Sequence, residues 1–119
     1  MYRLTIEHFG GSDIVTDSSS LRHVLAKRCS PTESNDFWIS GESRYPALAI
    51  LVREQLSCLH FIPRDGHPGF QSRGDANDRG QVTFFTNTST EQIDVPNEAV
   101  VPFEQALHAA EEFAQSNSL

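Results

Sequence analysis

The N-terminal residues alternate between hydrophobic and polar side chains, with Tyr2, Leu4 and Ile6 separated by polar residues. This period of two is typical of a strand that buries one face. We expect Gly10 and Gly11 to end the strand, because paired glycines interrupt regular structure.

A short helix is expected next, beginning near Asp17. Leu21, Val24 and Leu25 recur at helical spacing. Asp17, or one of the three serines that follow it, can accept a hydrogen bond from the free N–H groups of the first turn. The pattern therefore predicts a short helix that buries one apolar stripe.

Three apolar runs in the middle of the chain have the aromatic and β-branched content of strands. They span residues 37–39, 47–52 and 56–62. Only residues 53–55 separate the last two runs, so we expect a hairpin there. Trp38, at the centre of the first run, is assigned to the core.

The longest irregular segment covers residues 63–80 and contains a short extended stretch at 70–72. Long loops in compact domains are usually functional. Beyond it, residues 82–86 read as a strand and residues 91–95 as a weaker one. Pro96 should end that strand, because proline cannot donate to a sheet ladder.

The C-terminal segment has the clearest helical pattern. Pro102 suits the first position of a helix, where its missing N–H is not needed. The residues spaced to form one buried stripe are Phe103, Ala106, Leu107, Ala110, Phe113 and Ala114. Strands outnumber the two helices, so we expect a single domain over residues 1–119 of the α+β class, with a mainly antiparallel sheet and two helices packed on it.

The balance of charge restricts the kinds of partner. Nine Lys and Arg residues against 16 Asp and Glu residues give a formal net charge of −7. Nucleic-acid binding depends on basic side chains, so we expect no direct contact with nucleic acid and favour a basic protein partner. No apolar run approaches the ~20 residues of a membrane helix and nothing resembles a signal peptide, which predicts a cytoplasmic protein with no membrane partner. In a reducing cytosol Cys29 and Cys58 would remain thiols.

Candidate catalytic chemistry is confined to His60, Asp65 and His67. They could serve a small hydrolase or a metal-dependent enzyme, but the two histidines lack the i, i+4 helical spacing of a zincin site. Cys58 lies among large apolar residues, which favours burial over a nucleophilic role. We therefore expect no catalytic residue, no metal and no cofactor. A ligand-binding regulatory module is a third hypothesis.

Carboxylates and aromatic side chains close to turns are the ingredients of a protein interface. Loops that a sheet holds in place can also vary in sequence to match one partner. The residues that we expect to contact a partner are Glu42, Tyr45, Asp65, His67, Phe70, Asp75 and Asp78.

Three stretches of the chain match the motifs of a known family in order and spacing. They are Trp38-Ile39-Ser40-Gly41 followed by Tyr45-Pro46-Ala47-Leu48, then Asp65-Gly66-His67-Pro68-Gly69-Phe70-Gln71-Ser72, then Val95-Pro96-Asn97-Glu98 leading into Pro102-Phe103-Glu104-Gln105-Ala106. Over about residues 37–113, the chain resembles immunity protein family one of bacterial polymorphic toxin systems. In that family a closing strand with a tryptophan often follows the last helix, whereas here the chain ends at Leu119.

The resemblance implies a small cytosolic α+β protein encoded beside a secreted toxin, frequently a nucleic-acid deaminase, which it binds and inhibits. It implies no catalytic residues in this chain. Together with the acidic composition, which suits the basic cleft of an enzyme that grips nucleic acid, it leads us to expect inhibition by covering the toxin's active site.

Overall fold

The computed structural model describes residues 2–74, 80–86 and 91–116. The helices and strands, in chain order, are β1 (Leu4–His8), β2 (Gly11–Val15), α1 (Ser18–Leu25), β3 (Ser34–Ser40), β4 (Ala47–Arg53), β5 (Leu56–Ile62), β6 (Phe70–Gln71), β7 (Gln81–Thr86), β8 (Glu91–Pro96), a 3₁₀ turn (Asn97–Ala99), β9 (Val101–Pro102) and α2 (Phe103–Ser116). The α+β class, with a mainly antiparallel sheet and two helices packed on it, is confirmed.

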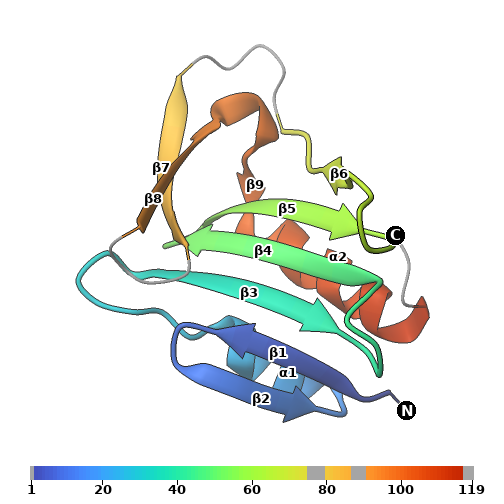
Figure 1. Ribbon diagram of the computed structural model, residues 1–119. Coiled ribbons are helices and arrows are strands. Elements are labelled where there is room, and N and C mark those ends of the chain that lie inside the picture. The colour runs from blue at the N-terminus through green and yellow to red at the C-terminus, as the bar shows by residue number, and fades with distance from the viewer. Residues whose placement is uncertain (1, 75–79, 87–90, 117–119) are drawn as a thin grey trace.

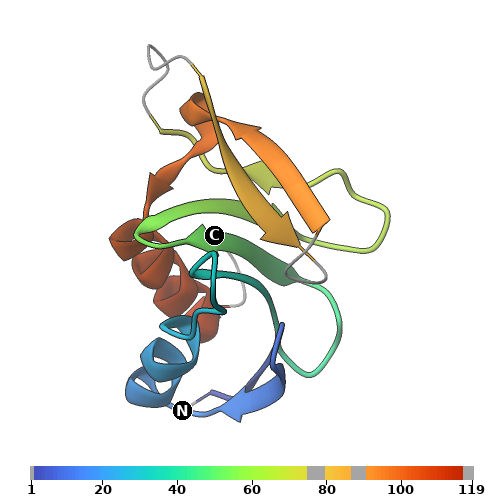
Figure 2. The same ribbon diagram turned by 90° about the vertical axis from the view of Figure 1, so that its left-hand side faces the viewer.

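The molecule has three layers around a central sheet. Among the described residues, seven strands form this sheet in the order β2-β1-β3-β4-β5-β6, with β9 also paired to β5. Both helices lie on one face of the sheet, and the β7–β8 hairpin lies on the other (Figures 1 and 2). No helix in the described part of the chain is both long and apolar enough to cross a membrane.

The N-terminal strand ends at His8, just before the glycine pair, as expected. The chain turns there into a strand that was not expected, the antiparallel edge strand β2, which begins at Gly11 opposite His8. Gly11 has a φ of 128°, a conformation that side chains disfavour, so glycine suits the turn. The sequence pattern missed β2 because it buries only Val15 fully and leaves Ile14 exposed.

The expected helix and the central hairpin are confirmed. Asp17 is the N-cap of α1, and its carboxylate accepts a hydrogen bond from the Ser20 N–H at 2.7 Å. β4 and β5 pair in register up to Arg53 opposite Leu56. The strand expected at residues 37–39 begins earlier, at Ser34. It can include Asn35, which is buried, because the Asn35 amide donates to Lys27 and accepts from the backbone N–H of Phe9.

The apolar stripe of α2 is buried as predicted and fills the space between the helices and the sheet. Pro102, however, is not the first residue of the helix. It lies in β9 opposite Leu56, and the helix starts at Phe103, whose N–H donates to the Gln55 carbonyl at 2.8 Å. The short β9 pairing ties the start of α2 to the edge of β5.

The two strands expected near residues 82 and 91 exist, but they form a separate two-stranded sheet. They pair in register from Gln81–Pro96 to Thr86–Glu91. This hairpin closes a second, smaller core on the face of the main sheet opposite the helices. The buried members of that core are Cys58, Phe84, Val95 and Ala99. The hairpin therefore covers part of a sheet face that would otherwise be open.

Candidate functional site

The face of the main sheet opposite the helices is only partly covered. Cross-strand partners point to the same face of a sheet. One row of cross-strand partners lies next to β7 and consists of Asp36, Leu51 and Cys58. The Thr86 hydroxyl of β7 donates to the Asp36 carboxylate. Leu51 and Cys58 pack in the second core. The next row along the strands is more open. It consists of Glu7, Trp38, Ala49, His60 and Gln71, none of which is fully buried.

Two loops extend from the same end of this sheet. The β3–β4 loop covers residues 41–46 and the β5–β6 loop covers residues 63–69. They share an end because β3 and β5 are both antiparallel to β4. The structure thereby places five of the predicted contact residues at one end of the molecule. They are Glu42, Tyr45, Asp65, His67 and Phe70 at the start of β6. Asp75 and Asp78 lie outside the described residues.

Two histidines, one in β5 and one in the loop, bond to the backbone of the β5–β6 loop. His67 accepts a hydrogen bond from the Gly69 N–H at 2.8 Å, and its ring lies 5.3 Å from the ring of Phe70. The His60 ring contacts the Pro68 carbonyl at 2.7 Å. Gly69 has a φ of 82°, and a Cβ there would lie 2.3 Å from the His60 ring, so this tight turn requires glycine. The turn presents Phe70 with 62% of its surface exposed.

The β3–β4 loop folds back over Trp38. The Tyr45 ring meets the Trp38 ring nearly edge-on, with ring centroids 5.8 Å apart. The guanidinium of Arg44 lies over the Trp38 ring at 4.7 Å, and it also approaches the Glu7 carboxylate at 3.7 Å. The assignment of Trp38 to the core is thus wrong. Phe37 and Ile39 are fully buried in the main core, on the face of the sheet that the helices cover. Because side chains alternate along a strand, Trp38 lies on the opposite face.

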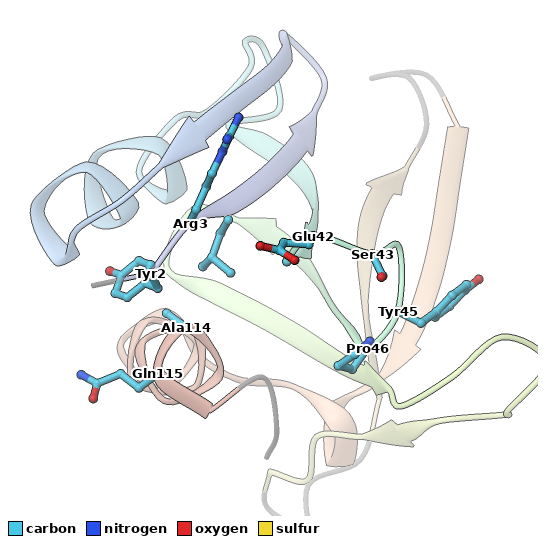
Figure 3. Close-up of a pocket in the computed structure, with 10 residues that line it drawn as sticks. Tyr2, Arg3, Glu42, Ser43, Tyr45, Pro46, Ala114 and Gln115 are labelled. Atoms are coloured by element: carbon cyan, nitrogen blue, oxygen red, sulfur yellow. The ribbon is translucent and has the colours of Figure 1, made fainter.

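A hollow lies on the helix side of the same loop. It has a volume of about 440 Å³ and opens between the first strand, the loop and the end of α2. Figure 3 shows Tyr2 beside Ala114 and Glu42 on the near side of the loop, with the Tyr45 side chain pointing away from the hollow. Burial raises the pKa of Tyr2, and the carboxylates of Asp17 and Glu111 add to the effect.

The proposed catalytic group of His60, Asp65 and His67 is not supported. Both histidines bond to the backbone of the β5–β6 loop, His60 from β5 and His67 from the loop itself, and Asp65 is exposed. In the described ranges no three His, Cys, Asp or Glu residues gather as metal ligands. Cys58 is 4% exposed and burial raises its pKa, so the thiol stays protonated near neutral pH. Cys29 and Cys58 are both free thiols.

Comparison with known proteins identifies the class to which this chain belongs. The class is that of the immunity proteins, which inhibit toxins. The sequence model of the family described as Immunity protein Imm1 matches residues 18–119, and the chain belongs to this family. The chain is also similar to a double-stranded DNA deaminase immunity protein of Burkholderia cenocepacia (strain H111). The two are 25% identical over 107 residues, which cover 90% of this chain and 85% of that relative.

Sequence reasoning missed Glu7, Trp38 and Arg44 as members of an exposed cluster. One signal could have found part of it. If Phe37 and Ile39 face the core, a period of two places Trp38 on the other side of the sheet. No local pattern shows that Glu7, which precedes Trp38 by 31 positions, is its partner across the β1–β3 pair.

Proposed function

We propose that this chain inhibits a deaminase toxin that acts on nucleic acid, and that it does so by covering the toxin's active site. The observation that carries the proposal is the membership of the Imm1 family, together with the deaminase named in the description of the Burkholderia relative. We also propose that the chain works in the cytoplasm, where a toxin that attacks nucleic acid would meet its substrate.

The charge of the chain supports a basic partner. An enzyme that grips nucleic acid presents basic side chains along its cleft. The net charge of −7 on this chain would draw such a cleft toward it and speed encounter. The segment from Gly80 to Leu119 contributes no Lys or Arg of its own to the sequence, although Arg22 of α1 pairs with Glu111 in it.

The two loops at the end of the sheet are the proposed contact surface, with Glu42, Tyr45, Asp65, His67 and Phe70. A nanomolar complex corresponds to about −12 kcal/mol, whereas an exposed ion pair contributes at most ~1 kcal/mol. Aromatic anchors must therefore supply much of the affinity. Phe70 suits this role because it is largely exposed and held by a loop with internal hydrogen bonds. The carboxylates steer approach and orientation.

The proposal is tested with the toxin domain encoded beside this chain. The two proteins are mixed, their association is measured, and conversion of a DNA or RNA substrate by the toxin is followed with and without the chain. We expect a stoichiometric complex and loss of deamination, with nucleic acid and this chain competing for the toxin. A complex in which the toxin still binds its substrate would contradict active-site coverage.

The same assay separates inhibition from an enzymatic role of this chain. Cys58→Ser should protect against the toxin as well as the parent does, after correction for any loss of folded protein, and His67→Ala should lose protection only as far as it loses binding. If His67→Ala abolished protection while toxin binding stayed intact, a catalytic contribution of this chain would have to replace the inhibitor proposal.

A further inference from the structure

A small hollow lies on the sheet face beside the β3–β4 loop. It has a volume of about 220 Å³. The residues that line it are Glu7, His8, Phe9, Asp36, Trp38 and Arg44. Two carboxylates and the face of one indole thus surround the guanidinium of Arg44, while the ring of His8, which also lines the hollow, bonds to Asp13 at 2.7 Å. A carboxylate beside an aromatic face is the combination that binds a cation by charge and by cation–π attraction.

Arg44 occupies this hollow from within the same chain. Its guanidinium lies 4.7 Å from the centre of the Trp38 ring and 3.7 Å from the Glu7 carboxylate. The ion-pair distance is long for a charge-assisted hydrogen bond, and the side chains of Arg44 and Glu7 are 62% and 54% exposed. Water therefore screens the pair, and Arg44 is a weakly held occupant.

One polar group at this hollow lacks a hydrogen-bond partner in the described part of the chain, and another is fixed by one. The indole Nε1 of Trp38 is buried and has no hydrogen-bond partner among the described residues, which is unusual for a buried donor. The second carboxylate, Asp36, accepts a hydrogen bond from Thr86, so it is fixed at the rim by the β7–β8 hairpin. Tyr45 holds the Trp38 ring from its edge.

We propose that this hollow is a binding site for an arginine side chain of the toxin, which takes the place of Arg44 over Trp38 and against Glu7. The proposal rests on the proposed function only in naming the toxin as the source of the arginine. An arginine fits better than a lysine because its planar guanidinium can stack on the indole while its fork of N–H groups meets a carboxylate. Arg44 then swings outward on its exposed loop.

The site can be tested without the toxin, because Trp38 is the only tryptophan of the chain and its fluorescence reports on the hollow. The probes are acetylated, amidated triarginine and trilysine peptides. We expect saturable quenching or a shift of Trp38 emission with triarginine and weaker binding of trilysine. Arg44→Ala should tighten triarginine binding about two- to fivefold, the range of a cation–π contact at an exposed site. Glu7→Gln should weaken it by a similar factor.

Glu112→Gln is the matched control, since it removes one carboxylate from the exposed side of α2 and leaves the hollow intact. Circular dichroism and thermal melting check that all variants fold. Equal binding of the two peptides, no response of Trp38, or weaker binding by Arg44→Ala would overturn the site. A fall in binding by Glu112→Gln equal to that by Glu7→Gln would overturn it too, because net charge alone would then explain the effect.

A competition experiment tests the source of the arginine. Triarginine should slow association of this chain with the toxin, and Glu7→Gln should raise the peptide concentration needed for that competition about two- to fivefold. If the peptide binds as expected but does not compete, the toxin's arginine is not the occupant, although the inhibitor function would stand. If the toxin is not inhibited at all, the proposed function fails and the peptide result stands by itself.

Discussion

Phe70→Ala should weaken binding of the toxin mainly by speeding dissociation. A phenylalanine side chain buries about 150–250 Å² when it is fully enclosed. Phe70 is 62% exposed in the free chain, so a partner could cover about 120 Å² of it. At ~25 cal/mol per Å² this area corresponds to about 3 kcal/mol, and to about 2 kcal/mol once the retained Cβ is subtracted. The expected rise in Kd is therefore roughly 30-fold.

The effect should appear in the off-rate, because truncating a buried apolar anchor changes the lifetime of a complex more than its encounter. Surface plasmon resonance with immobilised toxin separates the two rates. Ile14→Ala is the matched control: Ile14 is 55% exposed, but it lies on β2, at the opposite edge of the sheet from β6. The thermal stability of both variants should match that of the parent, since each removes an exposed side chain.

The reasoning would be refuted if Phe70→Ala bound the toxin like the parent. An off-rate changed by Ile14→Ala and not by Phe70→Ala would place the contact surface at the other edge of the sheet. A change confined to the on-rate would also contradict the assignment of Phe70 as an anchor.

Three further changes probe steering, packing and charge. Asp65→Lys should slow association with the toxin, because it reverses a charge that attracts a basic partner. Association of the parent should slow as salt rises, because screening shortens the Debye length to about 8 Å near physiological ionic strength. Phe113→Ala should lower the free energy of unfolding by about 3–5 kcal/mol, measured in urea, because the ring is fully buried between α2 and the sheet. Glu111→Gln should remove about 1 kcal/mol at pH 7, because it removes the charge and one of the two oxygens that accept hydrogen bonds from Arg22 and join α1 to α2.

The last change also has a defined pH dependence. Hydrogen bonds from Arg22 and then from Ser18 lower the pKa of Glu111 from its usual 4.5 to about 2. Because the folded pKa is the lower one, this stabilisation is complete above about pH 4.5 and is lost as pH falls to about 2. The Glu111→Gln variant should lose less stability across that window than the parent. Glu111 is 29% and Arg22 42% exposed, which is why we expect about 1 kcal/mol and not the full value of the pKa shift.

Each of these outcomes has a control. Asp65→Asn should slow association less than Asp65→Lys, because it removes one charge without adding its opposite. If Phe113→Ala melts like the parent, α2 does not pack on the sheet through this residue. A Glu112→Gln variant that changes the acid profile as much as Glu111→Gln would show that the pH effect does not come from the pair with Arg22.

Local patterns in the sequence determined much of the secondary structure. The α1 cap at Asp17, the β4–β5 hairpin and the buried stripe of α2 all follow from short-range spacing, and the structure has each of them. These elements can be predicted because apolar residues that form a buried face recur along the chain with the period of the helix or strand to which they belong. The family resemblance likewise rested on contiguous motifs.

Patterns failed where burial was incomplete or where a strand was short. β2 has one fully buried residue, and β9 has only two residues, so neither shows a repeating pattern of buried and exposed positions. Pro102 satisfies the rule for a helix start, yet its place opposite Leu56 is decided by the edge of β5. A residue-level rule cannot anticipate a pairing with a strand that lies more than 40 positions away.

What the sequence by itself determined is the α+β class, the principal helices and strands, the acidic charge and the family. The tertiary structure decided which residues share a surface. Only the order of strands brings Glu7 beside Trp38, and only the β7–β8 hairpin separates the covered part of the sheet face from the open part. The physical reason is that side-chain periodicity is a property of one segment, whereas a binding surface is assembled from segments whose neighbours are chosen by long-range pairing and packing.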